Sequence, residues 1–133
     1  MKIKNVVVIG SGTMGSGIAA HLCNANVPVT LLDLKTEISE KARDRIHKSR
    51  PPLLLDRSKI NNIKVGNIDD NFDVVKDADW VVEAVVERID IKHQIYEKIF
   101  KARKEGAIVS SNTSSIPIKV LSEHLTDKEK KDF

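Results

Sequence analysis

Three glycines near the N-terminus follow a spacing that can hold a phosphate group. Gly10, Gly12 and Gly15 form a Gly-x-Gly-x-x-Gly motif directly after an apolar run and directly before a helix-like segment. In such a motif the first glycine permits a tight turn, the second lets the backbone approach a pyrophosphate, and the third lets the helix pack close to the strand. The helix N-terminus then offers free N–H groups and a positive dipole end to the anion. The residues between the glycines that we expect to line the same site are Ser11, Thr13 and Met14.

An acidic residue closes the second apolar run. Asp33 follows the segment Val27–Leu32 and lies eighteen residues after Gly15. A carboxylate at this place can accept hydrogen bonds from an adenosine ribose, and it repels a 2′-phosphate, so it favours NAD over NADP even with Lys35 nearby. The alternative is a glycine-rich turn with no ligand, but that alternative does not explain why an acid ends the second strand.

The bulk composition is that of one soluble globular domain. The chain has 133 residues, of which 41% are hydrophobic and 31% charged, and its net charge is +3. Because basic and acidic residues are interleaved, the charge does not favour nucleic acid. No apolar run approaches the ~18 residues of a membrane span, and no signal peptide is visible before the first strand. The single cysteine, Cys23, excludes a disulfide within the chain, and a cytoplasmic location follows as the default expectation.

Apolar runs alternate with helix-like segments along the whole chain. This order predicts an α/β fold of the Rossmann type, a doubly wound parallel sheet forming one domain over residues 1–133. We expect strands over about 3–9, 29–32, 63–65, 80–86 and 107–110, helices over about 14–24, 36–48 and 89–104, a short turn or helix over 72–76, and a last short helix after Pro117. Five strands are one fewer than a complete dinucleotide fold has, so the domain is expected to lack its last strand.

Two other segments leave alternatives open. The patch Leu53–Leu55 lies in an expected loop, where it either packs locally or contacts a partner. A sheet without its last strand has an unpaired edge, which invites pairing with another chain. We therefore expect a homodimer or an association with a partner chain. The last residues, 127–133, form a highly charged tail.

A second group of polar residues is expected at the same end of the sheet as the glycines. Glu83 to Glu87 and Lys92 lie at the end of the fourth strand and the start of the next helix, and Ser110–Ser115 follows the fifth strand. Ligands of doubly wound folds gather at the carboxyl ends of the strands. A hydroxyl-rich loop there can hydrogen-bond an alcohol or a carbonyl group, although serine and threonine also serve as helix N-caps.

Taken together, these motifs resemble one family. The segments Gly10–Gly15, Val81–Glu87 and Ser111–Ser115 resemble the N-terminal, NAD-binding domain of L-3-hydroxyacyl-CoA dehydrogenases, and the resemblance covers almost the whole chain. That family includes short enzymes and multifunctional fatty-acid oxidation proteins. Its reaction, in fatty-acid β-oxidation, converts L-3-hydroxyacyl-CoA to 3-oxoacyl-CoA with NAD as cofactor, so the resemblance implies an acyl-CoA substrate for the complete enzyme.

The resemblance also implies roles for single residues. The three glycines cradle the pyrophosphate, and Asp33 holds the ribose. Ala84 lies in the cofactor-binding segment, and Glu87 and Lys92 approach the nicotinamide side of NAD. Ser114 contacts the 3-oxygen of the substrate and orients it, and Asn112 braces the loop. The basic stretch 43–50 lies where the family places part of its coenzyme A contacts. No residue is assigned to a metal.

The family's catalytic histidine belongs to a His-Phe-Phe-Asn-Pro-like segment on the next strand, after the last residue of this chain. The four histidines present, His21, His47, His93 and His124, are expected on helices and at the surface. Three hypotheses follow. The chain is an NAD-binding domain that is inactive alone, a small oxidoreductase that finds its base elsewhere, or a non-catalytic NAD-binding module that assembles with another chain.

Overall fold

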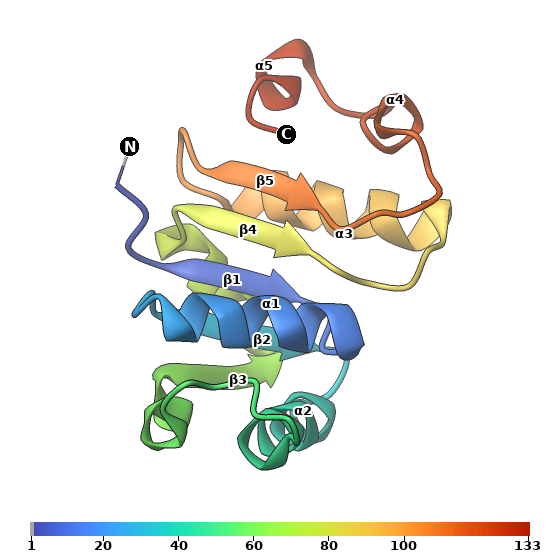
Figure 1. The fold of residues 1–133 in the computed structure, drawn as a ribbon. Coiled ribbons are helices and arrows are strands. Elements are labelled where there is room, and N and C mark those ends of the chain that lie inside the picture. The colour runs from blue at the N-terminus through green and yellow to red at the C-terminus, as the bar shows by residue number, and fades with distance from the viewer. Residues whose placement is uncertain (1) are drawn as a thin grey trace.

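The computed structural model describes residues 2–133 as a five-stranded parallel sheet with helices on both faces (Figure 1). The strands are β1 (Val6–Ile9), β2 (Val29–Asp33), β3 (Ile63–Asn67), β4 (Trp80–Glu83) and β5 (Ile108–Ser111). The helices are α1 (Thr13–Asn24), α2 (Thr36–Lys48), α3 (Ile89–Ala102), α4 (Ile118–Leu121) and α5 (Asp127–Lys130), with 3-10 segments η1 (Arg57–Asn62) and η2 (Phe72–Asp77). The strand order β3-β2-β1-β4-β5 confirms the predicted doubly wound sheet.

The central strands are apolar throughout because their residues enter two different cores. Val6 and Val8 of β1 pack with residues of α1 and α2 on one face of the sheet. Val7 and Ile9 pack with residues of α3 on the other face. Figure 1 shows the same division, with α1 and α2 on one side of the sheet and α3 on the other. A strand covered on both faces has no polar side, which explains the continuous hydrophobic runs in the sequence.

The strand order has its switch point at the carboxyl end of β1, the place where doubly wound folds bind their ligands. The chain passes from β1 to β2 on one side and later returns to β4 on the other, so the connections after β1 and β4 diverge. The register pairs Ile9 with Leu32 and with Glu83, and it pairs Glu83 with Ser111. Because these residues share one level of the sheet, the segments that follow the strands meet at one edge.

Strand β4 is shorter than the sequence predicted. It ends at Glu83 instead of Val86, because its neighbour β1 ends at Ile9, where Gly10 turns the chain away with φ 103°. The Glu83 carboxylate accepts a hydrogen bond of 2.8 Å from the N–H of Val85, which bends the chain out of the sheet. Val86 is consequently 59% exposed. The other predicted elements differ from the observed bounds mainly near their ends.

The apolar patch Leu53–Leu55 has a divided environment. Leu54 is buried in the core between the sheet, α1 and α2, as local packing predicts. Leu55 is 90% exposed. The side chain of Asn24 bridges the patch, since it donates to the carbonyl of Leu53 and accepts from the N–H of Leu55. Only the middle leucine therefore contributes to the core.

The highly charged tail, residues 127–133, is folded. Part of it forms α5, and the carbonyl of Asp132 accepts a hydrogen bond of 2.8 Å from the N–H of Val109 in β5. The carboxylate of Asp132 pairs with the guanidinium of Arg103 at 2.7 Å. The tail thus lies along the outer side of β5 and covers part of the sheet edge that we expected to be open (Figure 1).

Phe133 tests the contribution of this tail to stability. The centre of its ring lies 5.0 Å from the ring centre of Tyr96 and 6.4 Å from that of Phe100, and both pairs meet edge-on. We expect Phe133→Ala to lower the free energy of unfolding by about 1–3 kcal/mol, since it removes a partly buried aromatic ring and its ring pairs. Urea unfolding measures the change. The exposed neighbour Lys131→Ala is the control, and an equal loss in both variants would contradict this account.

Candidate cofactor site

The three motif glycines serve different purposes. A Cβ atom at Gly10 would lie 2.4 Å from the carbonyl oxygen of Ala84, and one at Gly15 would lie 1.8 Å from the carbonyl oxygen of Gly10. These two glycines let β1, α1 and the end of β4 pack together. A Cβ atom at Gly12 would meet no atom within 4 Å, and its φ of −68° needs no glycine. The protein therefore leaves this position free for the close approach of a ligand.

The N-terminus of α1 is prepared for an anion. Its first turn has no acidic residue, and Gly12 at the N-cap has no side chain to occupy the free amides. The N–H of Ser16 is the first to bond within the helix, to the carbonyl of Gly12 at 2.9 Å. The N–H groups of Thr13, Met14 and Gly15 remain for a ligand, and they carry the positive end of a twelve-residue helix dipole. This arrangement fits a pyrophosphate.

Asp33 holds the glycine loop from the end of β2. One carboxylate oxygen accepts hydrogen bonds from the N–H and the hydroxyl of Ser11, at 2.8 and 2.5 Å. The other oxygen accepts from the N–H of Leu34 at 2.7 Å. The carbonyl of Ser11 in turn accepts from Ser16 Oγ and from the guanidinium of Arg45. The predicted ribose-binding acid thus also braces the loop that would carry the phosphates.

The basic stretch 43–50 has contacts within the domain. Arg43 donates to the carbonyl of Ile63 at the start of β3, and Arg45 donates to the glycine loop. Both guanidinium groups therefore anchor α2 to neighbouring segments. The coenzyme A contacts that the resemblance implied for this stretch remain a prediction.

A buried charge network lies at the carboxyl end of β4. The side chains of Glu83 and Lys92 are fully buried, and Lys92 Nζ lies 2.6 Å from Glu83 Oε2. The second carboxylate oxygen, Oε1, accepts from the hydroxyl of Tyr96 at 2.5 Å and from that of Ser111 at 2.6 Å. One carboxylate therefore joins β4, β5 and α3.

The network satisfies the charges that the fold buries. A buried ion costs several kcal/mol unless it is paired and hydrogen-bonded, and Glu83 has both kinds of partner. Burial, followed by the hydrogen bond to Glu83, raises the pKa of Tyr96 far above its ordinary value, so its hydroxyl remains a donor. Sequence reasoning assigned no role to Glu83 or Tyr96. The available signals were an acid inside an apolar run and a tyrosine four residues after Lys92, on the same helical face.

Glu87 connects the network to the hydroxyl-rich loop after β5. Its carboxylate accepts from the N–H groups of Ser114 and Ser115 at 2.7 and 3.1 Å, and from the hydroxyl of Thr113 at 2.9 Å. The hydroxyls of both serines also lie within hydrogen-bonding distance, and Lys92 Nζ lies 3.2 Å away. These donors, led by the N–H of Ser114, hold the pKa of Glu87 well below its usual range.

The structure brings together the residues that the sequence singled out. Ala84 contacts the glycine loop and donates its N–H to the carbonyl of Ile9. Ser114 joins Glu87 and Lys92 in one bonded group. Asn112 contributes its backbone N–H, which donates to the carbonyl of Glu83 at 2.8 Å. Their roles toward ligands remain predictions.

One histidine prediction is wrong. His124 lies in the turn after α4 and not on a helix, because α4 ends at Leu121. The other three histidines lie on α1, α2 and α3 as expected.

A parallel sheet with a glycine loop at its switch point and an acid at the end of β2 defines a dinucleotide-binding α/β domain. Residues 5–132 match the family model described as 3-hydroxyacyl-CoA dehydrogenase, NAD binding domain. The chain belongs to this family, and its cofactor is NAD.

Relatives are much longer than this chain. A putative fatty acid oxidation complex trifunctional enzyme of Rickettsia felis is 44% identical over 99% of the chain, which spans 19% of that protein. A probable 3-hydroxyacyl-CoA dehydrogenase of Deinococcus radiodurans is 43% identical over 89% of the chain and 36% of its own length.

Solved structures show the same domain. The 3-hydroxybutyryl-CoA dehydrogenase of Escherichia coli matches with a TM-score of 0.83 and 26% identity over 98% of this chain and 29% of that one. The (S)-3-hydroxybutyryl-CoA dehydrogenase of Ralstonia eutropha matches with a TM-score of 0.77 and 31% identity, over 92% and 45%.

Substitutions of the motif glycines should affect NADH binding and fold stability separately. We expect Gly12→Ala to keep the melting temperature and to weaken NADH binding at least about tenfold, because its methyl group would occupy the space of the pyrophosphate. Gly15→Ala should instead destabilise the fold by about 1–3 kcal/mol through the clash with Gly10. Fluorescence titration and thermal unfolding measure the two effects. Gly17→Ala, which also meets no atom within 4 Å, is the control and should bind NADH normally.

Glu87 predicts how the serine loop responds to pH. The pKa of the Glu87 carboxyl is lower in the folded state than its ordinary pKa of 4.5. The carboxylate therefore stabilises the loop fully at pH values above 4.5, and this stabilisation is lost only as the pH falls toward the lower pKa of the folded state. The NMR shift of the Ser114 amide, followed during acid titration, should therefore change with a midpoint well below pH 4.5. Glu87→Gln should abolish that transition. A midpoint at the ordinary value would contradict the anchoring.

Proposed function

We propose that this domain supplies the cofactor half of an L-3-hydroxyacyl-CoA dehydrogenase that acts in fatty-acid β-oxidation. One observation carries the proposal. Glu87 binds the loop of Ser114 and also contacts Lys92, so the hydroxyl-rich loop is held at the same sheet edge as the glycine loop. An NAD-binding domain without a second reactant has no need for exposed hydroxyls fixed at this place.

Each group has a role in this proposal. The amides at the start of α1 hold the pyrophosphate, and Asp33 binds the adenosine ribose while it braces the loop. Glu87, which is partly exposed, lines the nicotinamide side, and the buried Lys92 holds its carboxylate there. When bound, NAD supplies the hydride acceptor. Ser114, whose hydroxyl donates to Glu87, contacts the 3-oxygen of the substrate and orients it, and Asn112 supports the loop. The histidine that takes the hydroxyl proton comes from outside these residues.

The surface around the site supports a longer protein. Exposed apolar side chains follow four of the five strands, at the sheet edge that carries the site. They are Met14, Leu34, Val86, Ile89 and Ile118. Apolar surface around a polar site is typical of a surface that ligand or protein covers. The name of the Deinococcus relative supports an acyl-CoA substrate, and that of the Rickettsia relative supports a multifunctional protein.

We also propose a cytoplasmic location. The sole cysteine, Cys23, is a buried free thiol, which is compatible with a reducing compartment. Within residues 2–133, no helix combines the length and the apolar character that crossing a bilayer requires.

The first test is an NADH titration of the 133-residue chain, followed by fluorescence, with NADPH as the competitor. We expect saturable binding of NADH and at least about tenfold weaker binding of NADPH, because Asp33 repels a 2′-phosphate. Asp33→Asn should reduce this preference. Equal affinity for both nucleotides would contradict the role of Asp33.

The second test concerns the reaction and uses the full protein that carries this domain. Acetoacetyl-CoA and NADH should react, and Ser114→Ala should lower kcat/KM by about 10–100-fold with little change in the affinity for NADH. Ser122→Ala, at the end of α4, is the control. NADH binding without any turnover of an acyl-CoA would favour the alternative, a non-catalytic NAD-binding module that assembles with another chain.

A further inference from the structure

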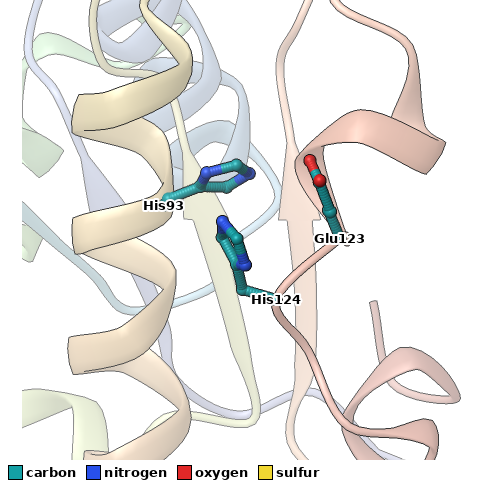
Figure 2. A group of neighbouring side chains, drawn as sticks. All are labelled: His93, Glu123 and His124. Atoms are coloured by element: carbon teal, nitrogen blue, oxygen red, sulfur yellow. The ribbon is translucent and has the colours of Figure 1, made fainter.

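Three side chains with metal-ligand chemistry gather away from the cofactor site. His93 projects from α3, while Glu123 and His124 lie in the turn after α4 (Figure 2). Each offers a ligand atom, and these atoms lie within 4.8 Å of one another. The centres of the two imidazole rings are 4.4 Å apart, and the rings meet edge to face. From the sequence we assigned no residue to a metal.

We propose that His93, Glu123 and His124 form a binding site for a divalent transition-metal ion, with Zn²⁺ as the best match. Two imidazoles and one carboxylate, with a fourth position open to solvent, are a ligand set that proteins use for zinc. Imidazole also binds Co²⁺, Ni²⁺ and Cu²⁺, whereas Mg²⁺ and Ca²⁺ prefer oxygen ligands. The chemistry of the donors therefore selects the class of ion.

A backbone contact holds the ring of His93 in place. Its Nε2 lies 2.9 Å from the carbonyl oxygen of Val120. A carbonyl oxygen only accepts, so Nε2 carries the hydrogen, and in the neutral ring the lone pair lies on Nδ1. Metal-ligating histidines commonly donate their other ring N–H to a carbonyl in this way, which fixes the tautomer and the ring orientation.

The surroundings leave room for an ion and allow the site to close. The histidines line a cavity of about 340 Å³ that Glu97, Glu129 and Lys101 also line, with Lys101 paired to Glu97. Ligands of a tetrahedral ion at ~2.0–2.1 Å lie roughly 3.3 Å from one another, so the side chains must draw together slightly. Glu123 and His124 are exposed and belong to a turn, which leaves their side chains room to do so.

An ion at this place would link two parts of the domain that the cofactor site uses. His93 follows Lys92 on α3, and α4 begins four residues after Ser114. A bound ion therefore joins the helix of the charge network to the segment that continues from the serine loop. Because it binds the folded chain, it stabilises that arrangement in proportion to its occupancy.

The test is a titration of the metal-free 133-residue chain with Co²⁺ and Zn²⁺. We expect one equivalent of Co²⁺ to produce the visible absorption of a tetrahedral complex, displaced by Zn²⁺, and Zn²⁺ to raise the melting temperature by several degrees. Glu123→Gln and His124→Asn should each weaken the affinity by roughly 100-fold, since even loss of a group that orients a ligand costs about 10–100-fold. Both positions are exposed, so the variants should fold and should bind NADH as before.

His47→Asn is the matched control, because His47 is an exposed histidine on α2, away from the cluster. It should leave the metal affinity unchanged. Three results would overturn the proposal: no saturable binding of either ion, unchanged affinity in Glu123→Gln and His124→Asn, or an equal loss in His47→Asn. The NADH titration of the same samples is independent of these results, so failure of the metal site is distinguishable from failure of the cofactor site.

Discussion

The ion pair between Glu83 and Lys92 is the constraint on which the site depends. Both side chains are fully buried where β4, β5 and α3 meet, and Lys92 Nζ lies 2.6 Å from Glu83 Oε2. Removal of Lys92 would leave Glu83 as an unpaired charge in the core, a change that typically costs about 3–5 kcal/mol. The Glu83 carboxylate also accepts hydrogen bonds from the hydroxyls of Tyr96 and Ser111. It therefore holds the ends of β4 and β5 and helix α3 together. The serine loop is connected to this pair through Glu87, which contacts Lys92 and accepts a hydrogen bond from the N–H of Ser114.

The glycine loop and the serine loop are held by the same kind of contact. Each follows a strand, and each is bound by a carboxylate from a neighbouring strand end, Asp33 for Ser11 and Glu87 for Ser114. A carboxylate accepts several hydrogen bonds at once, so it can order a loop whose backbone amides have no sheet partner. Parallel pairing makes this possible, because it places the carboxyl ends of all strands on one edge of the sheet. The loops are therefore positioned before any ligand arrives.

The sequence predicted the parts of this structure that depend on local pattern. The five strands, the three long helices and the glycine loop follow from apolar runs, helical spacing and glycine positions. The partners of Glu83 could not be predicted that way, because Ser111 lies 28 residues away and meets it only through the register of β4 and β5. The turn of His124 and the folded tail were missed for a related reason. Short helices with polar sequences are determined by contacts such as that of Asp132 with Arg103, which no periodicity reveals.

Residues packed closely by the protein and residues left accessible are separate in this domain, although they are neighbours in the chain. Gly10 and Gly15 have close protein atoms where their side chains would be, whereas Gly12 faces open space. Glu83 is buried and bound by four donors of its own domain, whereas Glu87 is partly exposed and holds serines whose hydroxyls reach the surface. A motif that looks uniform in sequence therefore contains two kinds of constraint. Only the structure separates them, because the distinction depends on which atoms from other strands lie within contact distance.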